Sequence, residues 1–246
     1  MAAAKEEVFT LKIQVDANQT WSFNYYCNNS GSLDILDWGD GTASTYTASG
    51  TASHNYITAG TYTIKMVGNL YRAAFGSPNT ATDNSDAVID CNGNWTALGN
   101  ITKLLYGFSC CTNFVGASLH SLPENLENAL SMFYGCASMA SILTALPATL
   151  TSATGAFWNC TAAINLTRLP PGLVNASRMF SDAVNLTADL DTLSANAPAG
   201  GWSALTNISY MFTRCTGVTG SKSAFLAKCP NVTASDYWDT GTSTTE

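Results

Sequence analysis

The sequence predicts a mainly β protein in two parts, a small β-sandwich followed by a solenoid of about five coils. Two observations lead to this fold class. Apolar and polar residues alternate with a period of two through residues 8–67, and a motif centred on phenylalanine recurs in the second half of the chain. The expected parts are a sandwich over residues 1–70, a linker and N-terminal cap over 71–100, repeats over 101–232, and a C-terminal cap and loose tail over 233–246.

Each expected strand of the N-terminal part has one apolar face. Every second residue in 9–15 and again in 21–25 is apolar, and the residues between them are mostly polar. The Gly-Asp-Gly segment at 39–41 is a turn signal, and another alternating strand begins after Gly60. Because such strands bury one face each, we expect two packed sheets.

The second part is built on a repeat. Each copy places a phenylalanine seven residues after an apolar residue, and a cysteine or alanine follows three residues later. The intervals between phenylalanines are 25, 24, 23 and 32 residues, which fits a solenoid with one insertion before Leu205. A single coil cannot bury its apolar row alone, so we expect the coils to stack and align their phenylalanines. These are Phe108, Phe133, Phe157, Phe180 and Phe212.

Prolines mark where each coil turns. Pro123, Pro147 and Pro170 each stand three residues before the leucine that opens a coil. Proline fixes φ and lacks an N–H donor, so it suits a corner and not the interior of a hydrogen-bonded ladder.

The cysteines are expected to be buried thiols. One repeat position is occupied by Cys111, Cys136, Cys160, Ala183 and Cys215, as a small apolar site would allow. Three consecutive coils carry one cysteine each and cannot all pair, so we predict a column of thiols and no disulfides. The only close pair is Cys110-Cys111, whose side chains should diverge, so no metal site built on cysteines is expected.

Charge argues against several classes of partner. The net charge is -7, and no basic run could neutralise a row of phosphates, so nucleic-acid binding and anionic membranes are disfavoured. No apolar stretch reaches membrane-spanning length, and charges at residues 5–7 occupy the place of a signal peptide's apolar core. We therefore expect no membrane insertion and synthesis as a cytosolic product.

Two segments of the chain resemble known families. Asp37-Trp38-Gly39-Asp40-Gly41-Thr42, with His54-Asn55-Tyr56 and the strand after Gly60, resembles the signature of polycystic-kidney-disease (PKD) type immunoglobulin-like domains. The resemblance implies a structural role for Trp38, Gly39, Asp40, Gly41, His54 and Tyr56. About 60 residues is short for that family, so one strand should be missing or supplied by the linker. The Leu-x-x-Ala-x-x-Met-Phe-x-x-Cys coils resemble BspA-like leucine-rich repeats of bacterial surface proteins and of phages and prophages of gut bacteria.

This pairing implies display or adhesion rather than catalysis. We expect a non-enzymatic bacteriophage virion component, head-decorating or tail-associated, whose partners are other virion proteins or a host cell-surface protein or glycan. Self-association into a homo-oligomer is left open. The alternative is a bacterial cell-surface adhesin, which would need an export signal. Neither implies a cofactor.

A calcium-dependent or hydrolytic enzyme is the third interpretation. The chain has two histidines: His54 lies in the PKD-like signature, and His120 has no recurring acidic partner. Two sets of aspartates could each surround a calcium ion, but the capping of turns explains their positions more simply. They are Asp37 with Asp40, and Asp83 with Asp86 and Asp90.

Positions that vary between repeats, beside the constant phenylalanines, are the expected binding surface. Tyrosine, tryptophan and arginine are the residue types that anchor interfaces. The candidate binding residues are Tyr134, Trp158, Arg178, Asp182, Tyr210 and Arg214. The competing interpretation is that these are ordinary solvated side chains, with Trp158 packing on a neighbouring coil.

Overall fold

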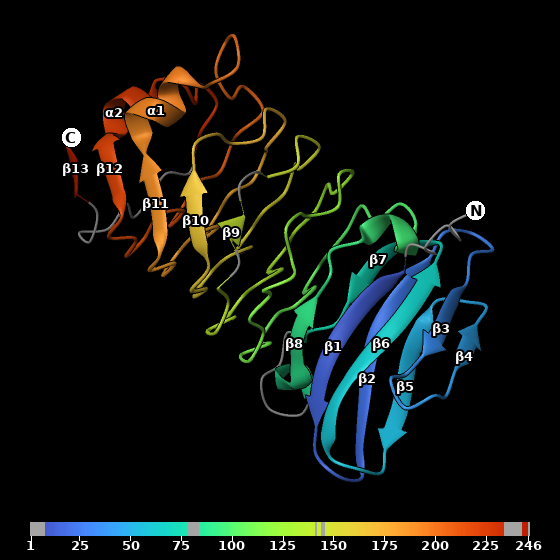
Figure 1. Ribbon diagram of the computed structural model, residues 1–246. Helices are drawn as coiled ribbons and strands as arrows, with labels where there is room; N and C mark the ends of the chain where they lie inside the picture. Colours follow the sequence, from blue (N-terminus) through green and yellow to red (C-terminus); the bar gives the residue numbers. More distant parts are fainter. Residues whose placement is uncertain (1–7, 78–83, 141, 144–145, 234–242, 246) are drawn as a thin grey trace, which may run out of the picture.

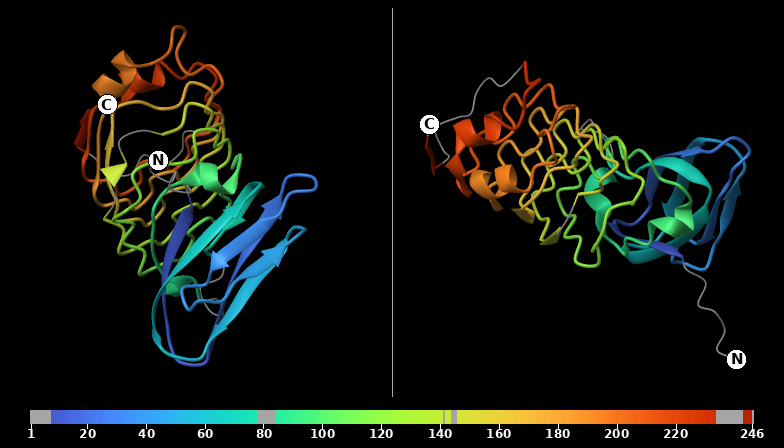
Figure 2. Two further views of the ribbon diagram at one scale, coloured as in Figure 1. Left: turned by 45° about the vertical axis from the view of Figure 1, so that its right-hand side comes forward. Right: turned by 90° about the horizontal axis from the view of Figure 1, so that it is seen from above.

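The computed structural model describes residues 8–77, 84–140, 142–143, 146–233 and 243–245 (Figure 1). The described part is mainly β, as predicted, with the sandwich strands at one end of an elongated molecule and short helices near the other (Figures 1 and 2). The strands are β1 (Phe9–Val15), β2 (Gln19–Cys27), β3 (Leu33–Asp37), β4 (Ser44–Tyr46), β5 (Gly50–Tyr56), β6 (Gly60–Gly68), β7 (Leu70–Ala74), β8 (Val88–Cys91), β9 (Ile142–Leu143), β10 (Ala163–Leu166), β11 (Leu186–Asp189), β12 (Val218–Ser221) and β13 (Ser243–Thr245). The helices are the 3-10 turns η1 (Asn84–Ala87) and η2 (Trp95–Leu98), and α1 (Leu190–Ala195) and α2 (Lys222–Leu226).

Two antiparallel sheets form the N-terminal end. One has the strand order β4-β3-β6-β1-β8 and the other β5-β2-β7. The period-two alternation sets which face is buried: in β1 the side chains of Phe9, Leu11 and Ile13 are buried, while Lys12 between them is exposed. The buried faces of both sheets belong to one hydrophobic core, which the alternation predicted.

Residues 71–100, expected as a linker and cap, contribute to both sheets. Strand β7 pairs with β2, and β8 pairs with β1 at the edge of the larger sheet. Both N-terminal sheets therefore include a strand from this segment, so the segment is more than a linker and cap.

Successive repeats are joined by a regular backbone ladder. In the second repeat, alternate N–H groups donate to carbonyls of the third: Ala129 to Ser152 at 2.9 Å and Phe133 to Ala156 at 2.8 Å, for example. The N–H groups between them close turns within their own repeat, such as Tyr134 to Ser131 at 3.3 Å. Each repeat is thereby hydrogen-bonded to the next while its own backbone folds through consecutive turns.

Two positions in every repeat adopt a left-handed backbone, two residues before and two residues after the phenylalanine. Their φ angles run from 48° at Ser131 to 71° at Gly135. Only two of these positions hold glycine, although other residues pay a steric cost of about 1–2 kcal/mol there. The full set is Tyr106, Cys110, Ser131, Gly135, Gly155, Asn159, Arg178, Asp182, Tyr210 and Arg214.

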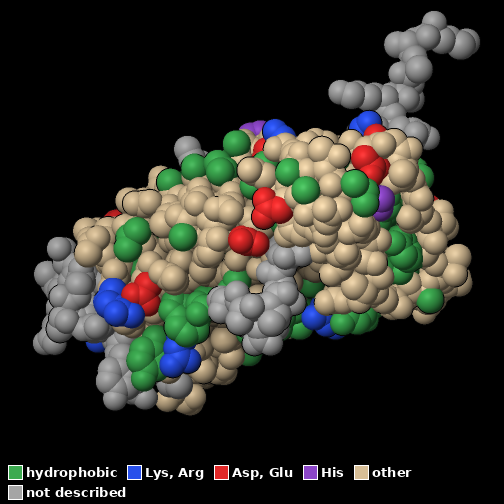
Figure 3. Space-filling view, turned by 90° about the horizontal axis from the view of Figure 1, so that it is seen from below, with side chains coloured by type: hydrophobic (Ala, Val, Ile, Leu, Met, Phe, Trp, Pro, Cys, Tyr) green, Lys and Arg blue, Asp and Glu red, His purple; other side chains and the backbone are tan. Residues whose placement is uncertain are grey.

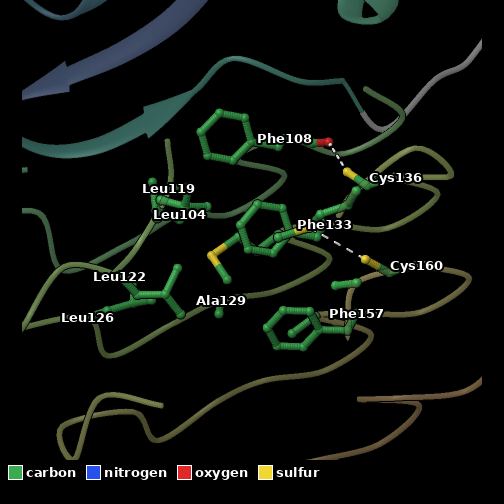
Figure 4. Close-up of a cluster of buried hydrophobic side chains, with 14 of the residues drawn as sticks. Leu104, Phe108, Leu119, Leu122, Leu126, Ala129, Phe133, Cys136, Phe157 and Cys160 are labelled. Atoms are coloured by element: carbon green, nitrogen blue, oxygen red, sulfur yellow. Dashed lines mark hydrogen bonds between the residues drawn. The ribbon is translucent and has the colours of Figure 1, made fainter. Parts of the chain in front are cut away.

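The phenylalanines align in one buried column, here called the phenylalanine file (Figure 4). Centroids of successive rings lie 5.4, 5.5, 5.5 and 5.9 Å apart, and the rings are close to parallel. All five side chains are 0% exposed. The prediction that these residues align is confirmed. The members are Phe108, Phe133, Phe157, Phe180 and Phe212.

The file continues into the sandwich. Phe75, just after β7, packs on Phe108 at 5.4 Å and on Phe23 of the smaller sheet at 5.1 Å. The Phe75 N–H also donates to the Gly107 carbonyl at 2.7 Å. Buried residues of both parts form one continuous core. The strand module, which the sequence suggested was separate, therefore packs directly on the first coil.

A turn follows each of the three repeat prolines. The N–H groups of Leu126, Leu150 and Leu173 donate to the carbonyls of Pro123, Pro147 and Pro170 at 3.1, 3.1 and 3.3 Å. Farther round each coil, β9 to β12 pair in parallel, one strand from each successive repeat.

The long interval before the last phenylalanine contains a helix that the pattern did not predict. Asp189 caps α1 by accepting from the Thr192 N–H at 3.0 Å, and α1 packs against α2. Within the segment expected as a loose tail, β13 instead pairs in parallel with β12, so this prediction is corrected. The rest of that tail, 234–242 and 246, lies outside the described residues.

Candidate functional site

The residues of the PKD-like signature form one packed cluster. His54 stacks on Trp38 with centroids 5.1 Å apart, and His54 Nε2 lies 2.7 Å from Asp40 Oδ2. The Tyr56 hydroxyl donates to the Trp38 carbonyl at 2.9 Å. Hydrogen bonds from the Thr42 hydroxyl, and then from His54, lower the pKa of Asp40 to about 2. Each of these polar groups is used to hold the turn against the sheet.

The turn itself depends on two glycines and an aspartate. Gly39 and Gly41 have φ angles of 92° and 86°, and a Cβ atom on Gly39 would lie 2.8 Å from the Thr63 backbone nitrogen. Asp37 Oδ1 accepts from the N–H groups of both glycines at 2.7 and 3.1 Å, while Oδ2 lies 3.3 Å from Lys65 Nζ. Asp37 therefore caps the turn, as expected.

The other acidic residues considered for calcium do not converge where they are described. Asp90 accepts from the Ser118 N–H and hydroxyl at 3.0 and 2.7 Å, whereas Asp86 offers its backbone carbonyl to Asn113. Asp83 lies outside the described residues. Over the part of the chain that the structure describes, no three His, Cys, Asp or Glu side chains are grouped to hold a metal ion. Exposed His120 has no described acidic residue within ion-pair distance.

The shared cysteine position faces the core, and its thiols are unpaired, as predicted. Figure 4 shows the Cys136 thiol reaching the preceding repeat, where it donates to the Phe108 carbonyl at 3.0 Å. The Cys215 thiol likewise donates to the Phe180 carbonyl at 2.8 Å, whereas the Cys160 thiol donates to the Met139 sulfur at 3.6 Å. Burial raises the pKa of Cys160 to about 12. These thiols are protonated packing groups, not nucleophiles.

The six predicted binding residues lie together on the surface of the coils. The Tyr134 and Trp158 rings have centroids 4.8 Å apart. Arg178 follows, with its Cζ 5.6 Å from the Trp158 centroid and 4.6 Å from that of Tyr210. These four planar groups come from four successive repeats, and we call them the outer stack. The rings are half-buried and Arg178 is exposed.

Asp182 connects the outer stack to Arg214. Its carboxylate receives Arg214 Nε at 2.6 Å and Nη2 at 2.9 Å, a bidentate pair. It also accepts from Trp158 Nε1 at 3.2 Å and from the Ser181 hydroxyl at 3.1 Å. Ser181, which is buried, was not among the six predicted binding residues. With Asp182 engaged in this way, no described carboxylate lies within ion-pair distance of Arg178.

A pattern of side-chain size becomes visible in these residues once the repeats are aligned by their phenylalanines. One large planar residue stands in each repeat, either two residues before the phenylalanine or one residue after it, and the other position is small. The large residues are Tyr106, Tyr134, Trp158, Arg178 and Tyr210, and their small counterparts are Ser109, Ser131, Gly155, Ser181 and Thr213. Tyr106 was not among the predicted residues, although it occupies the same repeat position as Arg178 and Tyr210.

The flat faces of the rings and of the Arg178 guanidinium are therefore used in packing between neighbouring repeats. Trp158 does pack on neighbouring coils, as the competing interpretation expects. The ring edges, the tyrosine hydroxyls and the edge of the Arg178 guanidinium are the parts that a partner could contact. On the face in Figure 3, basic groups at the left-hand end lie beside hydrophobic ones, and one of these basic groups touches an acidic group. Such a surface can donate hydrogen bonds and recognise an acidic group.

Comparisons with protein-family models, curated proteins and solved structures found no match for this chain. Among the described helices, none has the length and apolar character needed to span a bilayer. The site must therefore be interpreted from its own chemistry.

Proposed function

We propose that this chain is a non-enzymatic display or adhesion protein whose contact surface is the outer stack together with Asp182 and Arg214. The N-terminal sandwich would be of the PKD immunoglobulin-like type, and the repeats a BspA-like leucine-rich-repeat solenoid of five coils. One observation carries the proposal: six side chains chosen from sequence as interface types meet on one surface, although they come from four different repeats.

The repeat geometry supports the solenoid assignment. Each repeat is hydrogen-bonded to the next at equivalent positions, a single parallel bridge recurs from Lys103 to Asn207, and the phenylalanines stack at 5.4 to 5.9 Å. The Trp38–His54–Asp40 cluster supports a structural use of the PKD-like signature.

Binding is favoured over catalysis by how the reactive groups are used. His54 is packed between Trp38 and Tyr56 and bonded to Asp40, and the thiols of the repeats are buried with raised pKa values. The exposed groups of the outer stack are ring edges, hydroxyls and guanidinium, which suit recognition.

The setting we propose is a bacteriophage virion, in which the protein decorates the head or associates with the tail. The resemblance of both segments to display modules supports this setting, with other virion proteins or a host cell-surface protein or glycan as partners. A bacterial cell-surface adhesin would use the same surface and is the second candidate.

Mass spectrometry of purified particles tests the setting. Peptides of this chain in stoichiometric amount with capsid or tail proteins are the expected result. Its absence from particles, together with its recovery from the outer surface of bacterial cells, would overturn the virion proposal and favour the adhesin.

A matched pair of arginine variants tests the contact surface. Arg178 and Arg168 are both exposed, but only Arg178 belongs to the outer stack. In binding of labelled protein to particles lacking it, or to host cells, Arg178→Ala and Trp158→Ala should weaken binding about tenfold or more. Arg168→Ala should bind like the natural chain. Equal affinity for all variants would place the contact surface elsewhere.

A further inference from the structure

A second cationic cluster lies at the junction of the sandwich and the first coil, away from the outer stack. Arg72 of β7 stands directly opposite Tyr26 of β2 in the strand register, and its Cζ lies 4.4 Å from the Tyr26 ring centroid. Lys103 of the first coil places its Nζ 5.7 Å from the centroid of Tyr71. The two rings are themselves 6.2 Å apart, so one aromatic pair flanks both cations.

Backbone pairing places the two residues that carry these cations on neighbouring segments of a parallel ladder. Arg72 bridges in parallel to Lys103, and Lys103 bridges to Asn128 of the second repeat. Neighbouring rungs of such a ladder are about 5 Å apart. All three side chains are half-buried. Two basic residues and an amide residue therefore occupy bridged backbone positions next to one another along the junction.

The described protein supplies no counter-charge. No described carboxylate lies within ion-pair distance of Arg72 or Lys103, and Arg72 Nε is buried without a described hydrogen-bond partner. Asn128 Oδ1 accepts from the Leu130 N–H at 3.0 Å, but no described group accepts from the Asn128 amide N–H atoms. Positive charges on bridged positions repel each other when no counter-charge is near, and here they occur in a chain of net charge -7.

We propose that Arg72, Lys103 and Asn128 form a binding site for a doubly charged tetrahedral oxyanion, a phosphate or sulfate group. The guanidinium offers a planar fork to two oxygens, the ammonium is a mobile point charge, and the amide donates to a third oxygen. Two adjacent cations favour a dianion over a carboxylate. The dianion can be a free ion or a phosphate monoester carried on a polymer, and the site is independent of the proposed contact surface.

Calorimetric titration of the whole chain with inorganic phosphate, inorganic sulfate, acetate and dextran bearing phosphate monoesters tests this site at constant ionic strength. Phosphate and sulfate should bind, and acetate should bind at least about tenfold more weakly. Binding of the phosphorylated dextran that exceeds inorganic phosphate per phosphate group would identify a polymer-borne group as the ligand; equal binding would identify the free ion. Absence of binding by both dianions and the polymer, or acetate binding as tight as phosphate, would overturn the proposal.

Single-charge variants locate the site. Lys103→Gln and Arg72→Gln should each weaken phosphate binding about tenfold or more, while Lys12→Gln, which removes an exposed charge from β1, should leave it unchanged. Equal losses in Lys12→Gln and Lys103→Gln would show only general charge attraction and reject the site. Lys103→Gln decides the matter if Arg72→Gln does not fold.

Stability without a dianion gives a second, independent measurement. In dilute chloride buffer Lys103→Gln should unfold at the same temperature as the natural chain or a higher one, because it relieves repulsion with Arg72. Phosphate should then raise the unfolding temperature of the natural chain more than that of the variant. A variant that unfolds at a lower temperature in chloride would show that Lys103 stabilises the junction by itself, against the proposal.

Discussion

The same repeats build both the phenylalanine file and the outer stack, but one column is fully buried and the other is partly exposed. The file repeats one residue type at 5.4 to 5.9 Å spacing, and its side chains are fully buried. The outer stack spans similar distances, 4.6 to 5.6 Å, with tyrosine, tryptophan and arginine in turn. Only the file needs identical shapes, because only the file is closed on every side.

The comparison shows how the array can vary without unfolding. A buried ring has neighbours above, below and around it, so a change of volume leaves a cavity or a clash. A half-buried planar group needs a face on which to stack, and a ring or a guanidinium can both supply one. Changes in the file should therefore alter stability most, whereas changes in the outer stack should alter recognition most.

Phe157→Ala should have the largest effect on stability. Phe157 packs between Phe133 and Phe180 at 5.5 Å on each side, so truncation removes two stacking contacts and leaves a central cavity. We expect a loss of about 3–5 kcal/mol in the free energy of unfolding, measured by denaturant titration. Phe157→Leu, which keeps most of the volume, should lose less. A cost no greater than that of Trp158→Ala would erase the distinction between the two columns.

Cysteine variants refine the comparison inside the core. Cys160→Ala should cost about 1 kcal/mol or less, because Ala183 fills the same position one repeat later. Cys160→Ser should cost about 1–3 kcal/mol, since its hydroxyl would be buried beside the Met139 sulfur. Cys136→Ser should be milder, because the Phe108 carbonyl can accept from the new hydroxyl. Equal costs for the two serine variants in denaturant titration would contradict this account.

Alkaline pH should lower the free energy of unfolding of the repeats, because two of their buried thiols resist ionisation. Burial raises the pKa of Cys160 and Cys215 to about 12, from an ordinary value of 9.0. The folded state keeps these thiols neutral while the unfolded chain ionises, so stability is complete below about pH 8 and falls as pH rises toward 12. The loss should be on the order of 1 kcal/mol per thiol between pH 8 and 10. When the free energy of unfolding is plotted against pH across this range, Cys160→Ala should have a shallower slope than the natural chain. An unchanged slope would show that the Cys160 thiol is not a source of the pH dependence.

The file was predictable and the stack was not, for a physical reason. A seven-residue spacing from leucine to phenylalanine recurs because closed packing accepts few alternatives, and the proline corners recur because of backbone geometry. The outer stack has no recurring residue type, and its large member shifts between two positions after Trp158. Its four residues, with Asp182 and Arg214, could be chosen by type, but their contacts depend on how the repeats align.

The junction shows a second limit of sequence reasoning. Phe75 lies outside any alternating or repeating pattern, yet it joins Phe23 of the sandwich to Phe108 of the first coil. Helix α1 similarly occupies an interval that the pattern marked only by its length. Periodicity predicts what recurs, while contacts made once per molecule leave no periodic signal.

The smallest expected effect is at Arg178, where side chain and backbone have opposite preferences. Its φ of 53° favours glycine, whereas its stacking on Trp158 and Tyr210 favours arginine. Arg178→Ala keeps the backbone strain and loses the cation–π contacts, so it should cost about 0.5–1 kcal/mol. Arg178→Gly loses the same contacts but relieves the strain, so its stability should stay close to that of the natural chain.

Gly155 supplies the matched control for that comparison. It occupies the position equivalent to Arg178 one repeat earlier, with a φ of 58°, and a Cβ atom there would meet only ordinary contacts, the nearest at 3.4 Å from Ser131 Oγ. Gly155→Ala should therefore lose about 1 kcal/mol through backbone strain alone, measured by the same denaturant titration. If Arg178→Gly were instead the less stable of the two Arg178 variants, the left-handed backbone would not oppose the arginine. In the expected outcome, the repeat holds arginine against its local backbone preference, as a residue kept for recognition would require.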